Sequence, residues 1–269
     1  MRIVYWSPLS GQSGTTSNIM ATSIMSILKL KKKVLLINAQ HDKHSMENAL
    51  IGFMSSEMLE DIGIDVLLRN MKINQVNADT IKNASFSFFG EQLDFLPGTT
   101  KEKNQFEKDM LQSFNRILDI ANSIYDYVFI DIGSGMNEIN IKVIDVAEQV
   151  VVNLPQSRVP IESFMREDNP LTIHKDKFIY LIGNYNCNSR YNIKNLVRSF
   201  HDFKGKISAI PFNVDYLDAI SDSEVIRFIQ KNNIISHGKN KFFIKEVDKA
   251  VKLIGKKKGG SETCRSPQT

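Results

Sequence analysis

Short apolar runs alternate along this chain with segments in which apolar residues recur at helical spacing. Uninterrupted apolar runs are typical of strands buried on both faces of a parallel sheet, and the helical segments between them supply the crossovers. Strands are expected over residues 1–6, 34–37, 93–96, 127–130, 149–152, 178–182 and 207–210. Helices are expected over 18–30, 105–125, 139–147 and 241–256. The pattern therefore predicts an α/β fold with a mostly parallel sheet flanked by helices.

The pattern is least regular between residues 43 and 92, where we expect helices and a connection capping one end of the sheet. The alternation elsewhere is continuous enough to predict one domain over residues 1–255. Residues 256–269 are mostly polar, begin with a basic run, and are expected to form a disordered tail.

Composition narrows the class of protein only slightly. The chain has 269 residues and a net charge of +4 at pH 7, and its apolar runs fall short of the roughly 18 residues that span a membrane. The amino-terminal residues lack the pattern of a secretory signal, and Cys187 and Cys264 show no metal or redox spacing. A cytoplasmic protein is therefore expected. The basic residues form no long stripe with interleaved aromatic residues, so DNA is not favoured as a partner.

The segment between the first expected strand and the first expected helix has the composition of a phosphate-binding loop. Glycines allow backbone amides to close on an anion, and the amino end of the helix favours negative charge. A standard phosphate loop reads G-x-x-x-x-G-K-[ST], and here Thr15 stands where the lysine belongs. An ordinary strand-to-helix turn is the alternative. The candidate phosphate-binding residues are Gly11, Gln12, Ser13, Gly14, Thr15, Thr16 and Ser17.

Asp131 is the best single candidate for a magnesium site. It directly follows the apolar run 127–130, and an aspartate in that position holds Mg²⁺ through water in phosphate-loop proteins. The Thr16 hydroxyl is expected to be the other protein group on the metal. The alternative for Asp131 is a cap on the helix that follows it.

Several motifs in the same order resemble those of the MinD/ParA family of deviant-Walker P-loop ATPases, over residues 1–254. The family's K-G-G-x-G-K-T-T is matched by residues 10–17, its L-L-I-D-x-D-P-Q by 35–42, and its D-Y-V-I-I-D-x-P-P by 126–134. Its A-D-E-V-L-I-P-V-x-P is similar to residues 147–156. The resemblance implies a P-loop three-layer architecture, ATP and Mg²⁺ as cofactors, and a homodimer. It also implies that Asn184 recognises adenine and that Pro211 packs beside the base.

Charged residues of the family's motifs are missing here. Its two lysines align with Ser10 and Thr15, and its two second-strand aspartates align with Asn38 and Gln40. Because phosphoryl transfer depends on positioning and charge stabilisation, we expect hydrolysis to be slow or absent. A replacement cation is available in Lys43, after the second-strand motif, or in Arg158. The alternative for each is a solvated side chain.

Within the family, the altered loop resembles the TadZ/CpaE branch, although that branch's receiver-like domain has no counterpart in these 269 residues. The favoured function is an ATP-binding, dimerising scaffold for localisation or assembly, whose partner belongs to a secretion, pilus or conjugation-type assembly. The alternatives are an active partitioning ATPase and an interaction module without nucleotide. The segment 241–256 is amphipathic, and it is either a core helix or a peripheral contact with the inner face of the membrane.

Overall fold

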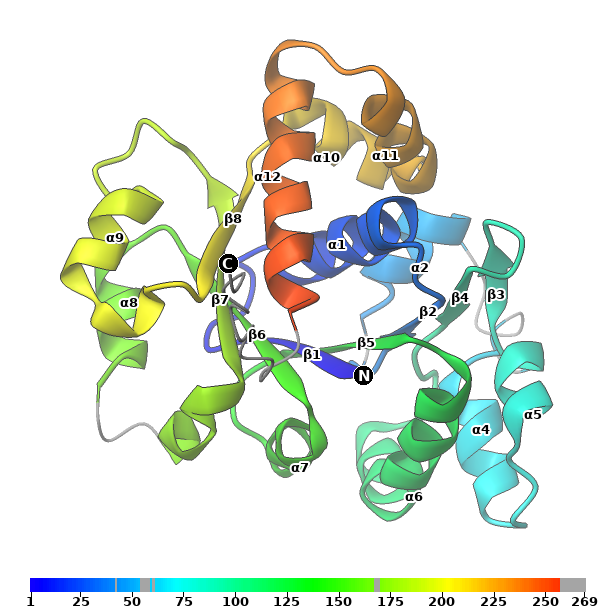
Figure 1. The fold of residues 1–269 in the computed structure, drawn as a ribbon. Coiled ribbons are helices and arrows are strands. Elements are labelled where there is room, and N and C mark those ends of the chain that lie inside the picture. Colours follow the sequence, from blue (N-terminus) through cyan, green and yellow to red (C-terminus); the bar gives the residue numbers. More distant parts are fainter. Residues whose placement is uncertain (42, 54–58, 60, 167–169, 257–269) are drawn as a thin grey trace, which may run out of the picture.

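The computed structural model describes residues 1–41, 43–53, 59, 61–166 and 170–256. Its centre is an eight-stranded sheet with the strand order β3-β4-β2-β5-β1-β6-β7-β8 (Figure 1). Each neighbouring pair runs parallel except β3 and β4, which are antiparallel. The strands are β1 (Arg2–Ser7), β2 (Val34–Asn38), β3 (Phe86–Phe88), β4 (Leu93–Leu96), β5 (Tyr127–Ser134), β6 (Gln149–Pro155), β7 (Phe178–Tyr185) and β8 (Ile207–Pro211).

Helices cover both faces of this sheet and make the fold three-layered. One face carries α1 (Thr15–Leu30), α2 (Ser45–Ile51), α10 (Val214–Ser221), α11 (Val225–Ile234) and α12 (Gly238–Ile254). The other carries α4 (Ile64–Met71), α5 (Ala78–Asn83), α6 (Lys103–Ile124), α7 (Glu138–Val146), α8 (Arg158–Phe164) and α9 (Ile193–Ser199). Short 3₁₀ segments at Pro170–Lys177 and His201–Phe203 precede β7 and β8. The predicted α/β fold class is confirmed.

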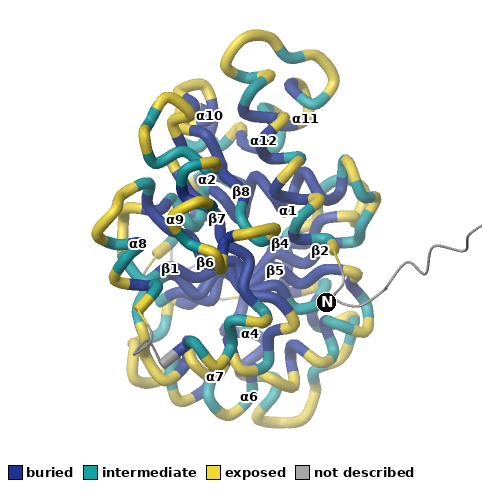
Figure 2. Tube along the Cα trace, turned by 60° about the vertical axis from the view of Figure 1, so that its left-hand side comes forward, coloured by how far each residue is buried: buried dark blue, intermediate teal, exposed yellow. Residues whose placement is uncertain are grey.

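The alternation of side chains along β1 shows how one strand builds both cores. Ile3 and Tyr5 point into the cluster under α1 and α12, while Val4 and Trp6 point into the cluster under α6 and α8. Successive side chains of a strand point to opposite faces, so a strand covered on both sides must be apolar at every position. Figure 2 shows the result as a band of buried strands between the helical layers.

Strands β5, β6 and β7 continue furthest past the apolar runs that predicted them. The central strand β5 extends to Ser134, β6 to Pro155 and β7 to Tyr185. Parallel pairing persists there although the extensions include polar or small residues such as Asp131, Asn153 and Gly183, since backbone hydrogen bonding does not require an apolar side chain. These extensions carry polar groups to the carboxyl edge of the sheet, where ligands bind in open α/β folds.

The segment 43–92 departs from the expectation of a cap over one end of the sheet. Its helix α2 packs in the α1 layer, α4 and α5 pack in the opposite layer, and β3 forms the antiparallel edge strand. The edge strand escaped prediction because it is only three residues long and its side chains are not fully buried.

The last helix, α12, is a core element. Phe243, Val247, Ala250, Val251 and Ile254 are buried in the cluster that includes α1 residues. The apolar face of the amphipathic segment is therefore covered by protein. Within the described residues, no helix is both long enough and apolar enough to cross a bilayer. The expected disordered tail, apart from Lys256, lies outside the described residues.

Candidate functional site

The loop between β1 and α1 leaves the amino end of the helix open. Gly14 occupies the N-cap position in the left-handed conformation, with φ 59° and ψ 34°, and no described side chain caps the helix there. Gly11 also has a positive φ, 76°, a conformation that glycine adopts without strain. First-turn amides that lack a side-chain cap are the groups that bind phosphate.

A buried polar network holds the loop from below. Asn18 Nδ2 donates to the Ser13 carbonyl (3.0 Å) and to Asn153 Oδ1 (2.9 Å). Asn153 Nδ2 in turn donates to the carbonyl oxygens of Trp6 (3.4 Å) and Val151 (3.1 Å). The loop is thus attached to strands β1 and β6 by hydrogen bonds within the protein.

Strand β7 supports the same loop sterically. A Cβ atom placed on Gly183 would lie 1.9 Å from the Ser13 carbonyl oxygen and 2.9 Å from Asn18 Nδ2. Only glycine lets the strand and the loop approach this closely. Asn153 and Gly183 were not among the residues predicted for the site. The available signal for Asn153 was its position directly after the apolar run 149–152, where a strand reaches the carboxyl edge of the sheet.

Asp131 meets Thr16 at the edge of this loop. The Thr16 hydroxyl donates to Asp131 Oδ2 (2.7 Å), and the Gly133 amide donates to Asp131 Oδ1 (2.9 Å). The carboxyl group is fully buried, and burial raises its pKa to about 6 against the opposing effect of the hydrogen bonds from Thr16, Gly133 and Gln40. The helix-cap alternative for Asp131 is wrong, because Asn137 caps α7 by accepting from the Asn140 amide.

A cavity of about 200 Å³, the phosphate cavity, opens over these groups. It is lined by Leu9, Ser10, Gly11, Ser13, Gly14, Thr15, Thr16, Ser17, Gln40, Lys43, Ser45, Gly133 and Ser134. Six of the seven predicted loop residues therefore line one cavity. The seventh, Gln12, is exposed and is not part of the lining.

The two second-strand positions that lack aspartate have different surroundings. Asn38 Nδ2 donates to the Lys43 carbonyl (2.7 Å) and to both carboxylate oxygens of Glu47 (2.9 and 3.0 Å), and Asn38 Oδ1 accepts from the Gln40 amide (3.1 Å). Asn38 is therefore engaged in shaping the loop that follows β2. Gln40 instead reaches the cavity, where its Nε2 donates to Thr16 Oγ1 (3.3 Å).

The predicted base-binding residues lie beside the same loop. Asn184 and Pro211 line a hollow of about 50 Å³ together with Ser17 and Asn18, and Ser17 also lines the phosphate cavity. Asn184 has a φ of 49°, and its side-chain amide lies 3.7 to 3.8 Å from the position a Gly14 Cβ would take. The exposed Phe212 ring also borders this hollow and was not predicted.

Of the two candidate cations, the structure brings one to the cavity. Lys43 is part of the lining. Arg158 lies at the start of α8, where its Nε donates to Glu162 Oε1 (2.6 Å), and it does not line the cavity.

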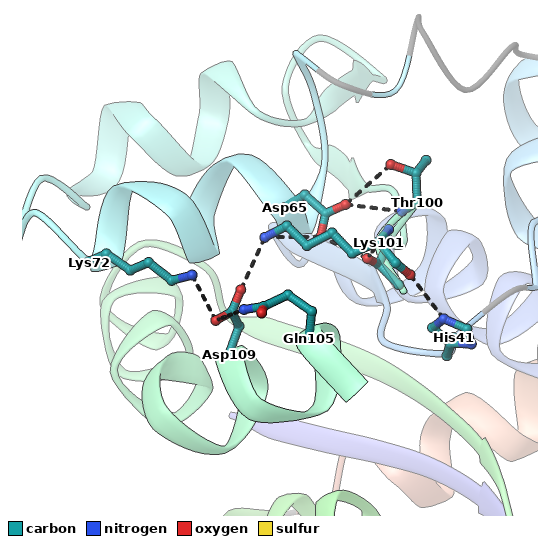
Figure 3. Close-up of polar contacts among 8 residues, drawn as sticks. His41, Asp65, Lys72, Thr100, Lys101, Gln105 and Asp109 are labelled. Atoms are coloured by element: carbon teal, nitrogen blue, oxygen red, sulfur yellow. Dashed lines mark hydrogen bonds and ion pairs between the residues drawn. The ribbon is translucent and has the colours of Figure 1, made fainter. Parts of the chain in front are cut away.

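A separate group of charged residues contacts the loop after β2 from the side of α4 and α6. In this Asp109 cluster, Asp109 pairs with Lys72 (2.8 Å) and Lys101 (3.2 Å), and Asp65 accepts from Thr99 and the Thr100 amide (Figure 3). The Lys101 carbonyl is 3.0 Å from His41 Nε2. The cluster connects α4, α6 and the segment after β4 to the same loop that carries Gln40 and Lys43.

The groups around Thr16 fit a magnesium nucleotide. Magnesium bound to phosphates usually takes only one or two protein ligands and keeps several waters. The Thr16 hydroxyl, backed by a buried Asp131, offers such a set beside the open end of α1. Among the described residues, no group of three or more His, Cys, Asp or Glu side chains is arranged to hold a metal.

The sequence matches no protein-family profile and no curated protein. The fold matches solved structures over almost its whole length. A ParA family ATPase from Chlorobium tepidum has a TM-score of 0.66 at 13% identity, covering 93% of this chain and 98% of that one. The MinC:MinD cell division complex of Aquifex aeolicus gives 0.65 at 18% identity, with 96% and 97% covered. MinD from Pyrococcus horikoshii, complexed with Mg-ADP, gives 0.61 at 15% identity, with 95% and 98% covered.

The chain therefore has the fold of the ParA and MinD ATPases. The resemblance recognised from the sequence motifs is confirmed at the level of the fold. The finer assignment to the TadZ/CpaE branch remains a prediction, since the structures reported above are ParA and MinD proteins.

Proposed function

We propose that this protein binds Mg-ATP at the amino end of α1 and acts as a dimerising scaffold for localisation or assembly, with weak or absent hydrolysis. The observation that carries the proposal is the Thr16–Asp131 pair beside an uncapped helix end, in a cavity lined by six of the predicted loop residues. The Mg-ADP in the MinD structure from Pyrococcus horikoshii supports a magnesium nucleotide as the ligand of this fold.

Weak hydrolysis follows from the neutral residues at four positions. Ser10 and Thr15 cannot neutralise charge that develops on phosphate, and Asn38 and Gln40 cannot accept a proton. Asn38 is also fully engaged by Glu47, Lys43 and the Gln40 amide. Backbone amides remain able to bind phosphate, so binding is retained where catalysis is lost. On the family resemblance, the proposal also includes a homodimer, a partner in a secretion, pilus or conjugation-type assembly, and peripheral membrane contact.

Binding of ATP, ADP and GTP, measured by titration calorimetry with and without Mg²⁺, tests the proposal. Asp131→Asn keeps the shape of the side chain but removes its charge, so we expect it to weaken Mg-ATP about tenfold or more and to change metal-free ATP little. Asp94→Asn is the matched control, because Asp94 is another strand carboxylate that is almost fully buried and lies outside the cavity lining.

The result separates the three functions. Absence of ATP binding by the folded wild-type protein at millimolar nucleotide would favour an interaction module without nucleotide. Steady ATP turnover at rates usual for enzymes, about 1 s⁻¹ or more, would favour an active partitioning ATPase. ATP-dependent dimerisation with little turnover, seen by analytical ultracentrifugation and a phosphate-release assay, supports the scaffold.

A further inference from the structure

Lys43 is the charged residue that the phosphate cavity exposes. The described lining otherwise consists of glycine, serine, threonine, one leucine and Gln40. A triphosphate carries several negative charges, and backbone amides supply only partial positive charge. A full positive charge close to the ligand would strengthen its binding in such a cavity, and Lys43 is the side chain of the lining that can supply it.

The Lys43 backbone is held by buried polar contacts. The Lys43 carbonyl accepts from Asn38 Nδ2 (2.7 Å), and the same amide is held by the buried Glu47 carboxylate. Glu47 Oε1 also accepts from the Gly98 amide (2.7 Å) after β4. The backbone at Lys43 is thereby fixed between β2 and β4, at the position where the family's second-strand motif carries an aspartate and this chain has Asn38.

The ammonium group of Lys43 is available to a ligand. The residue is exposed, and among the described residues it forms no ion pair within 4.0 Å. Lys43 also lines an adjoining cavity of about 210 Å³, which includes His41 and Lys103. It therefore lies where the two cavities meet.

We infer that Lys43 contacts the outer phosphates of the bound nucleotide and replaces, from the loop after β2, the lysine that the phosphate loop lacks. This inference rests on the proposed nucleotide binding. The cation comes from a different segment of the chain than in a standard phosphate loop, and its side chain approaches from the side of Gln40 and Thr16. A long flexible side chain from that side binds phosphate as a point charge and needs no change in the loop.

Calorimetric titration of the full chain with Mg-ATP and with AMP tests the inference. Lys43→Gln is expected to weaken Mg-ATP at least about tenfold and to leave AMP, which lacks the outer phosphates, within about twofold. Lys103→Gln is the matched control, since Lys103 lines only the adjoining cavity, and it is expected to change both affinities by about twofold or less. Adding Thr15→Lys to Lys43→Gln is expected to restore most of the lost ATP affinity.

Failure of the inference and failure of the proposed function give different results. If Lys43→Gln binds Mg-ATP as tightly as the wild type does, the inferred role of Lys43 is wrong, and the proposed nucleotide binding still holds. Equal losses in Lys43→Gln and Lys103→Gln also overturn it, because they indicate only a general effect of net charge. A double variant that regains no affinity counts against a shared role for the two positions. Absence of nucleotide binding by the wild type overturns both proposals.

Discussion

The phosphate cavity and the Asp109 cluster lie on the same loop after β2, but their charged residues differ in whether they are paired. In the cluster, Asp109 is almost fully buried and is paired with Lys72 and Lys101, so its charges are compensated within the protein. In the cavity, Lys43 is the one charged residue of the described lining. Charges that are already paired stabilise the packing of helices, whereas Lys43, which has no ion pair with any described residue, can interact with a ligand beside the open amides.

The largest effect is expected from a steric change that disrupts the phosphate cavity without altering its charge. Gly183→Ala places a Cβ atom 1.9 Å from the Ser13 carbonyl oxygen, so either β7 or the phosphate loop must move. We expect a loss of about 3 kcal/mol in the free energy of unfolding and no detectable ATP binding. Urea unfolding and titration calorimetry measure the two effects.

Gly205→Ala is the control for that variant. Gly205 has a φ of +74° but no atom within 4 Å of its Cβ position, so only backbone strain of about 1 kcal/mol is expected, with ATP binding unchanged. Wild-type ATP affinity in Gly183→Ala would show that the loop does not need its contact with β7, and the cavity as described would then be unimportant for binding.

The fold was readable from the sequence because buried parallel strands leave a strong signal. The run 34–37 lies within β2, and the run 93–96 coincides with β4. Both runs are mostly apolar because these strands are covered on both faces. Part of the site was readable for a related reason. Glycines and an aspartate that follow apolar runs mark the carboxyl edge of a sheet, and the structure brings Gly11, Thr16 and Asp131 together there.

The rest of the site depends on contacts between distant segments. Nothing near Asn38 in the sequence shows that its amide faces Glu47, nine residues later and one element away. Likewise, the role of Gly183 arises only from the approach of β7 to Ser13, which is 170 residues distant in the chain. Spacing rules detect groups that share an element. They do not detect groups that meet through packing.

The next largest effect is expected from a buried negative charge added beside the cavity. Asn38→Asp would place two carboxylates about 3 Å apart in a buried position, where Asn38 now donates to Glu47 at 2.9 and 3.0 Å. We expect the free energy of unfolding at pH 7 to fall by about 2 kcal/mol, with a smaller loss at pH 5, where one proton can be shared. Urea unfolding at the two pH values measures both.

Glu47→Gln in the same chain is the compensating change. It removes one of the two carboxylates, so the double variant is expected to recover most of the stability that Asn38→Asp loses. If Asn38→Asp alone is as stable as the wild type, the buried contact with Glu47 does not explain the presence of asparagine at this position.

The smallest effect is expected in the Asp109 cluster. Burial opposes the ionisation of Asp109, but hydrogen bonds from Lys72, Gln105 and Lys101 outweigh it and hold the pKa of this carboxyl below its usual range. Lys72 and Lys101 remain 50% and 27% exposed, so water compensates much of their charge when the partner is lost. Asp109→Asn is therefore expected to cost about 1.5 kcal/mol at pH 7, less than the removal of a partner from a fully buried pair.

The pH dependence of that cost tests the origin of the effect. Because the pKa of Asp109 is lower in the folded state, its ionisation stabilises the fold above the unfolded carboxyl pKa of about 4, and this contribution disappears as the pH falls through the lower folded value. The difference between wild type and Asp109→Asn should be constant from pH 7 to about 5 and then shrink. Asp119→Asn, which breaks an exposed pair with Arg2, is the control and should cost about 0.5 kcal/mol or less. Mg-ATP affinity should be unchanged in both variants, and a loss of affinity in Asp109→Asn alone would show that the cluster's charges reach the ligand through the loop they share.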